Sequence, residues 1–92
     1  MIMAAPPPAG QQWPDLVGRT DMDGVVDTIC EDREDVTQIC EVLPGQALSS
    51  GECTVLDPQA ATTVRVIITY INVDGGGKQV TNPAPYIGSF AQ

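Results

Sequence analysis

The segment from Thr62 to Val73 constrains the fold of this chain more than any other part of its sequence. Successive residues of an extended chain point to opposite faces, and both faces of this segment are apolar. One face carries Val64, Val66, Ile68 and Tyr70, and the other carries Ile67, Ile71 and Val73. A strand with two apolar faces is covered on both sides, so we predict a central strand here. Because the chain has only one Trp, two Tyr and one Phe, its core must rest mainly on Val, Ile and Leu.

A helix is predicted in the first third of the chain. Thr20 provides a hydroxyl that can cap the helix, and Asp21 and Asp23 place negative charge near the positive end of its dipole. Four apolar residues follow at helical spacing: Met22, Val25, Val26 and Ile29. Gly24 within this run costs about 1 kcal/mol relative to alanine. We predict that the helix ends near residues 31–32.

Extended segments flank the central strand on both sides. Val36 to Leu43 is apolar and β-branched enough to form a strand, which Pro44-Gly45 ends. Asp74 to Gly77 predicts a turn after the central strand. A short strand around Gln79 to Thr81 and an extended segment from Ala84 to Ile87 complete the predicted elements.

The stretch between Pro44 and Thr62 predicts a long loop, which we place at residues 45–62. It contains small and polar residues, two glycines and one proline, without a sustained helical period. Long irregular loops are uncommon in compact domains and are often functional. A linker between two subdomains is the alternative, although neither flank is long enough to form a domain of its own.

Residues 1–12 are predicted to be a flexible, proline-rich tail and residues 13–92 a single domain. Pro6, Pro7 and Pro8 favour polyproline geometry and present no periodic apolar face. A domain of about 80 residues lies near the small end of what folds alone. The opening MIMAAPPPAG lacks the cationic start and apolar core of a signal peptide. We therefore expect either a cytoplasmic protein or the processed form of a secreted one.

The chain is strongly acidic, with twelve Asp and Glu residues against four Lys and Arg residues and a formal net charge of −8. Eight of the acids lie between Asp15 and Asp35. This concentration indicates a solvated helix face, and steering toward a basic partner is the lesser alternative. We expect no binding to nucleic acid or to anionic membranes, which repel such a chain. No apolar run approaches the roughly 20 residues that span a bilayer.

Three cysteines and the absence of histidine limit the chemistry of the chain. Cys30, Cys40 and Cys53 cannot all pair within one chain, so one disulfide with a free thiol and three reduced thiols are both open. The cysteine spacing matches no zinc site. Without histidine there is no Ser-His or Cys-His pair. We expect no enzymatic activity, no metal and no cofactor.

The sequence Trp13-Pro14-Asp15-Leu16-Val17-Gly18 stands just before the predicted helix. This W-P-x-L-V-G opening resembles that of the potato inhibitor I family of serine protease inhibitors, which includes the eglins and the barley chymotrypsin inhibitors. Later segments follow in a similar order: Val42-Leu43-Pro44, Thr54-Val55-Leu56-Asp57, Val64-Arg65-Val66 and Pro85-Tyr86-Ile87-Gly88. The resemblance spans Trp13 to Gly88. We expect Trp13 to be a core residue rather than a partner contact.

The resemblance implies an α+β fold made of a single small domain. One helix would pack on a small mixed sheet, and a long exposed protease-binding loop would join its two main parallel strands. The implied function is inhibition of serine proteases by a loop that binds as a substrate does. We expect the protein to be a monomer.

The resemblance also assigns residues to the inhibitory loop. Leu56 would enter the specificity pocket of subtilisin-like or chymotrypsin-like proteases, and the bond from Leu56 to Asp57 would be the reactive bond. The rest of the loop would comprise Thr54, Val55 and Pro58. Arg65 matches one of two family arginines that support the loop from the following strand, and Asp57 or Thr54 would bond to it.

The sequence departs from the family pattern at three positions. Thr54 lies one residue further from Leu56 than in the family, and Thr63 stands where a second supporting arginine is expected. Pro58 has no backbone N–H to offer a protease. The loop is also longer than in the family on its amino-terminal side. This length, Pro58 and the missing second arginine favour the alternative function, a non-inhibitory protein-interaction or structural module on the same scaffold.

Overall fold

The computed structural model describes residues 12–88 of the chain. The helix α1 (Met22–Asp32) is followed by five strands: β1 (Gln38–Val42), β2 (Glu52–Val55), β3 (Arg65–Val73), β4 (Gly77–Val80) and β5 (Tyr86–Ile87). Short 3-10 helices, Pro14–Leu16 and Leu48–Ser50, precede α1 and β2. Most of the predicted tail, residues 1–11, lies outside the described residues. Gln12, the last residue of that tail, forms a β-bridge with Tyr86.

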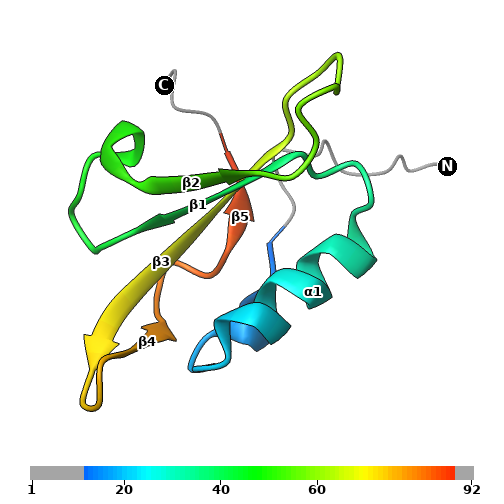
Figure 1. Ribbon diagram of the computed structural model, residues 1–92. Helices are drawn as coiled ribbons and strands as arrows, with labels where there is room; N and C mark the ends of the chain where they lie inside the picture. The colour runs from blue at the N-terminus through cyan, green and yellow to red at the C-terminus, as the bar shows by residue number, and fades with distance from the viewer. Residues whose placement is uncertain (1–11, 89–92) are drawn as a thin grey trace, which may run out of the picture.

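The five strands form one mixed sheet, and α1 packs against one of its faces (Figure 1). The strand order is β2-β1-β3-β4, with β5 also paired to β3. β1 and β3 are parallel, with Gln38 opposite Arg65 and Val42 opposite Thr69. The other strand pairs are antiparallel. The prediction of an α+β domain with one helix on a mixed sheet and two main parallel strands is therefore confirmed.

The helix α1 begins after Asp21, one residue later than the predicted cap at Thr20. The Asp21 carboxylate makes no capping bond. Instead it accepts two hydrogen bonds of 2.7 Å each from the guanidinium of Arg19. A Cβ atom at Gly24 would collide with this carboxylate. The glycine therefore costs helix propensity but leaves room for the Arg19–Asp21 ion pair.

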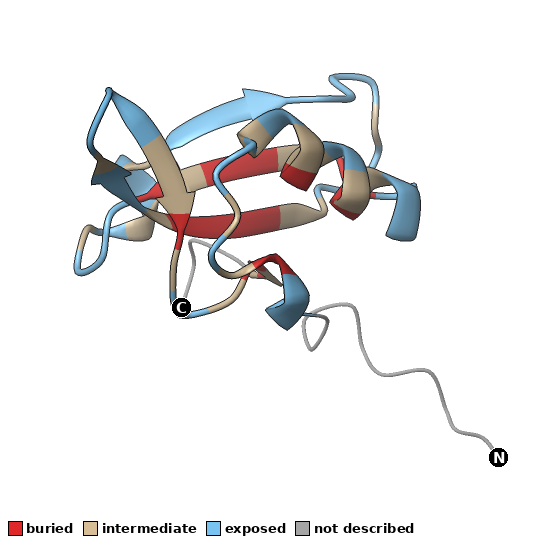
Figure 2. Ribbon diagram, turned by 90° about the horizontal axis from the view of Figure 1, so that it is seen from below, coloured by how far each residue is buried: buried red, intermediate tan, exposed pale blue. Residues whose placement is uncertain are grey.

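Most of the core lies between α1 and the sheet, where buried residues of both layers face each other (Figure 2). The inner face of α1 contributes Val25 and Ile29, and β3 contributes Val66 and Ile68, all of them fully buried. Trp13 is 5% exposed, which confirms that it is a core residue. Its indole N–H donates a 2.9 Å hydrogen bond to Oδ2 of Asp32 and so fastens the end of α1 to the segment before it.

The opposite face of the sheet carries a smaller apolar cluster. Cys40, Val42 and Ile67 are buried there, with Leu48 and Tyr86 packed against them. Ile67 and Ile68 are adjacent in β3 and both are fully buried, one on each face. The prediction that β3 is a central strand covered on both sides is confirmed for this part of the strand.

Lys78 on β4 ties together strands that are not neighbours in the sheet. Its Nζ lies 2.7 Å from Oε1 of Glu41 and 3.6 Å from Oε1 of Glu52. The ammonium also lies 4.6 Å from the centre of the Tyr70 ring. The hydrogen bond that Nζ donates to the Glu41 carboxylate is the main cause that raises the pKa of Lys78. The contacts of this one cation therefore reach from β4 across β3 to β1 and β2.

Ile68→Ala should lower the free energy of unfolding by about 2–5 kcal/mol, because a fully buried side chain is lost and a cavity remains. Ile71→Ala is the matched control on the same strand. Ile71 is 38% exposed, so we expect its loss to cost less than about 1.5 kcal/mol. Urea unfolding followed by Trp13 fluorescence measures both variants. Equal losses of unfolding free energy in the two variants would contradict the different burial of Ile68 and Ile71.

Candidate functional site

The predicted loop at residues 45–62 is partly folded into regular structure. A 3-10 helix at Leu48–Ser50 leads into β2, which pairs antiparallel with β1. The prediction of an irregular loop is therefore wrong for its first half, because residues 52–55 pair with β1 as a strand. The connection that remains irregular runs from Leu56 to Val64, between the end of β2 and the start of β3. It projects from one end of the sheet (Figure 1).

A disulfide between Cys40 and Cys53 fastens β2 to β1. The two residues lie directly opposite each other in the strand register. Cys30, on α1, is half-buried and carries a free thiol. Of the two cysteine arrangements that the sequence leaves open, the structure contains one disulfide and one free thiol.

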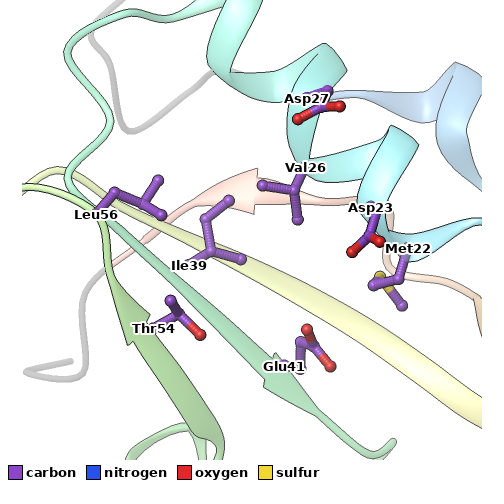
Figure 3. Close-up of a pocket in the computed structure, with 8 residues that line it drawn as sticks. All are labelled: Met22, Asp23, Val26, Asp27, Ile39, Glu41, Thr54 and Leu56. Carbon is purple, nitrogen blue, oxygen red and sulfur yellow. The ribbon is translucent and has the colours of Figure 1, made fainter.

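The residues assigned to the inhibitory loop fall on both faces of the sheet. Thr54 pairs with Ile39 and so points to the α1 side, whereas Val55 pairs with Gln38 and points away from it. Val55 is 55% exposed and Leu56 is 40% exposed. The side chain of Leu56 lies on the α1 side, next to Ile39 (Figure 3). Asp57 and Pro58 are also exposed.

Thr37 holds both ends of the connection between β2 and β3. Its carbonyl oxygen accepts hydrogen bonds from the N–H groups of Leu56, at 2.7 Å, and of Asp57, at 3.3 Å. Its Oγ1 accepts a 2.9 Å bond from the N–H of Val64, and its own N–H donates to the Val64 carbonyl at 2.8 Å. Thr37 was not among the site residues predicted from the sequence. One feature of the sequence could have pointed to Thr37: it is a threonine within a run predicted to be an apolar strand. A hydroxyl buried there needs a hydrogen-bond partner, which indicates a structural role.

The chain turns immediately after the Leu56–Asp57 bond. The N–H of Ala60 donates to the carbonyl of Asp57 at 3.3 Å, and Oδ1 of Asp57 accepts the N–H of Gln59 at 3.0 Å. Asp at the first position and Pro58 at the second are the residues that such a turn favours. The proposed reactive bond therefore follows an extended strand and precedes a turn.

Arg65 lies on the sheet face that points away from α1, where its Nε donates a 2.6 Å hydrogen bond to Oε1 of Gln38. It lines a hollow of about 200 Å³ together with Val55, Asp57 and Pro58. Arg65 and Thr54 lie on opposite faces, since they pair with adjacent residues of β1. The expected support of Thr54 by Arg65 is therefore wrong. Asp57 and Arg65 do lie beside the same hollow.

A groove runs between α1 and β2 and consists of two hollows that share Leu56 in their lining. Figure 3 shows the first of them. The first hollow, of about 460 Å³, is lined by Met22, Asp23, Val26, Asp27, Ile39, Glu41, Thr54 and Leu56. The second, of about 700 Å³, continues past Leu56 toward the end of α1, where Cys30, Val36 and Ala60 contribute to it. We call the two hollows together the α1–β2 groove.

Comparisons with protein-family models, with curated proteins and with solved structures find no significant match to this chain. Within residues 12–88, no group of three or more Cys, Asp or Glu side chains is arranged to hold a metal ion. In the same part of the chain, no helix is long and apolar enough to cross a membrane.

Thr37→Val keeps the side-chain shape and removes the hydroxyl that accepts the N–H of Val64. We expect the free energy of unfolding to fall by about 1–3 kcal/mol and the amide of Val64 to exchange faster with solvent. Thr63→Val, at an exposed position, is the control and should change little. Unchanged hydrogen exchange at Val64 would show that Thr37 does not fasten this end of the connection.

Removal of the disulfide by Cys40→Ala with Cys53→Ala should lower the free energy of unfolding by about 3 kcal/mol, because a closed loop of this length is released in the unfolded chain. The two cysteines are 13 residues apart. Cys30→Ala is the control, since it removes only the free thiol. Denaturant titration measures the stabilities. A thiol count of three in the native wild-type protein would contradict the disulfide.

Proposed function

We propose that this protein is a serine protease inhibitor that binds its target through residues 54–58. Leu56 would enter the specificity pocket and the bond to Asp57 would lie at the catalytic serine. The observation that carries the proposal is an exposed segment, between two parallel strands, whose backbone is fastened to the scaffold at both ends. The target would be a subtilisin-like or chymotrypsin-like enzyme.

Because residues 54–58 are attached to the scaffold, they lose little conformational entropy on binding, which favours inhibition over ordinary cleavage. Burial of a leucine side chain contributes roughly 1.5–3 kcal/mol, which is enough for a substrate. A tight inhibitor must also avoid the cost of ordering its loop on binding. Here the disulfide and the pairing with β1 hold residues 52–55 extended before the protease arrives.

The same bonds would keep the chain together after cleavage of the Leu56–Asp57 bond. The new carboxyl end would remain attached through β2 and its disulfide. The new amino end would remain attached through Val64 and Thr37 to β1 and through β3. Because both fragments would stay on one scaffold, re-formation of the peptide bond is favoured over release of the product.

A leucine at the specificity position selects among serine proteases. Subtilisin-like and chymotrypsin-like pockets accept a large apolar side chain, whereas a trypsin pocket contains a buried carboxylate and requires a cation. Leu56 would have to leave its contact with Ile39 to enter any such pocket. Since the side chain is 40% exposed, only part of its burial is lost in that movement.

A second candidate function is a protein-interaction module that does not inhibit proteases. Two observations favour it: the side chain of Leu56 lies in the α1–β2 groove, and the N–H of Leu56 already donates to the Thr37 carbonyl. Pro58 also lacks the backbone N–H that a protease would bond on the far side of the reactive bond. In this case the exposed segment serves a different partner.

Titration of subtilisin and of chymotrypsin with the pure protein separates the two functions. Slowly reversible inhibition at nanomolar concentration, with an intact chain in mass spectrometry, supports the inhibitor. Rapid cleavage after Leu56, or full protease activity at micromolar protein, refutes it and leaves the interaction module.

Leu56→Arg should transfer inhibition from chymotrypsin to trypsin, because the arginine matches the carboxylate of the trypsin pocket. We expect inhibition of chymotrypsin to weaken by about 10- to 100-fold, the equivalent of the lost leucine burial. Val55→Arg is the matched control, since it places the same cation one residue earlier and on the other face of the sheet. Trypsin inhibition by Val55→Arg rather than Leu56→Arg would move the specificity position to Val55.

A further inference from the structure

The charged side chains that line the α1–β2 groove are all acidic. They are Asp23, Asp27 and Glu41 in the first hollow and Glu34, Asp35 and Asp57 in the second. Two of the six form ion pairs, Glu41 with Lys78 and Asp35 with Arg33. Within residues 12–88, no ion pair reaches the other four. The groove is therefore a site of concentrated negative charge.

The floor of the groove between these acids is apolar. Val26 from α1, Ile39 from β1 and Leu56 from the connection after β2 lie between Asp27 above and Thr54 below (Figure 3). Lys and Arg side chains cover apolar surface with their aliphatic stems and keep their charged ends near water or a carboxylate. A groove with this floor and these margins matches such side chains in both shape and charge.

The strand beside the groove also has a free edge. In the described sheet β2 pairs only with β1, and all four of its residues are exposed. Cys53 and Cys40 lie 4.0 Å apart between Cα atoms, which is the spacing of a pair without mutual backbone hydrogen bonds. The N–H and carbonyl groups of Cys53 and Val55 therefore point away from β1. An exposed strand edge of this kind can pair with an extended segment of another chain.

We propose that an extended segment of a basic partner protein adds to the free edge of β2 and places alternate Lys or Arg side chains in the α1–β2 groove. Alternate residues of an added strand point to the α1 side, as Thr54 does in β2. Their stems lie against Leu56 and Ile39, and their charged ends meet Asp23 and Asp27.

Charge decides among the possible occupants of the groove. A second copy of this chain carries the same net charge of −8 and is repelled. An acidic segment is repelled for the same reason. A purely apolar segment is disfavoured because it would bring apolar groups next to the groove carboxylates without pairing their charge. The proposal does not depend on protease inhibition, since it requires no reactive bond and no protease.

The test uses the isotopically labelled protein and a short synthetic peptide that alternates Lys and Val, with both ends capped. We expect chemical-shift changes at residues 22–27, at Ile39 and along β2, and a binding constant that weakens as salt is added. Asp23→Asn with Asp27→Asn should weaken binding by about tenfold, the equivalent of two exposed ion pairs. Thermal unfolding of this variant confirms that it is folded.

Asp15→Asn with Asp74→Asn is the matched control, because both residues are exposed and lie outside the groove. It removes the same net charge and should change binding by less than about twofold if the contact is local. If both double variants weakened peptide binding equally, the effect would come from the net charge of the protein rather than from the groove, and the proposal would be overturned.

Two further ligands test the geometry of the partner. The same peptide with N-methyl groups on alternate amides keeps its charge and loses strand pairing, so it should bind at least about tenfold more weakly. Spermidine carries positive charge without a strand. Equal binding of either ligand, compared with the unmodified peptide, would refute strand addition.

Discussion

The arrangement of this protein depends on the backbone and side chain of one buried threonine. Thr37 stands just before β1, and its carbonyl fixes the chain as it leaves β2. Its hydroxyl and N–H fix the chain again as it approaches β3. The parallel pairing of β1 and β3 continues directly from this point. Both ends of the irregular connection between β2 and β3 are therefore hydrogen-bonded to Thr37. The exposed residues between them start and end at fixed positions on the scaffold.

The position of Leu56 links the two proposed uses of this surface. Its backbone belongs to the connection that would meet a protease, whereas its side chain lies in the α1–β2 groove. A protease would need the leucine to leave Ile39, but a basic segment in the groove would use the leucine where it lies. Both proposed partners would approach along β2, because the disulfide to Cys40 holds that strand extended and exposed. The two partners are thus expected to compete with each other.

Much of the fold could be predicted from patterns that are local in the sequence. The alternation of β-branched residues predicts β3, and apolar residues at helical spacing predict α1, because side-chain direction follows directly from backbone period. The predicted helix start is wrong by one residue, since Asp21 rather than Thr20 precedes the first helical residue. The carboxylate of Asp21 binds Arg19 instead of capping the helix, a choice that the spacing of apolar residues does not reveal. The parallel order of the two main strands was expected only from the motif order between Trp13 and Gly88 and not from any local pattern.

The sequence by itself determined the strands with strong alternation, the helix, the acidic surface and the absence of histidine chemistry. The tertiary structure decided the rest of the site: the pairing of Cys40 with Cys53, the strand β2 inside a predicted loop, the role of Thr37 and the groove beside Leu56. These features join residues far apart in the chain, such as Thr37 and Val64 at a separation of 27 positions. A local pattern shows that a backbone or thiol group needs a partner, but only the folded chain decides which distant partner it meets.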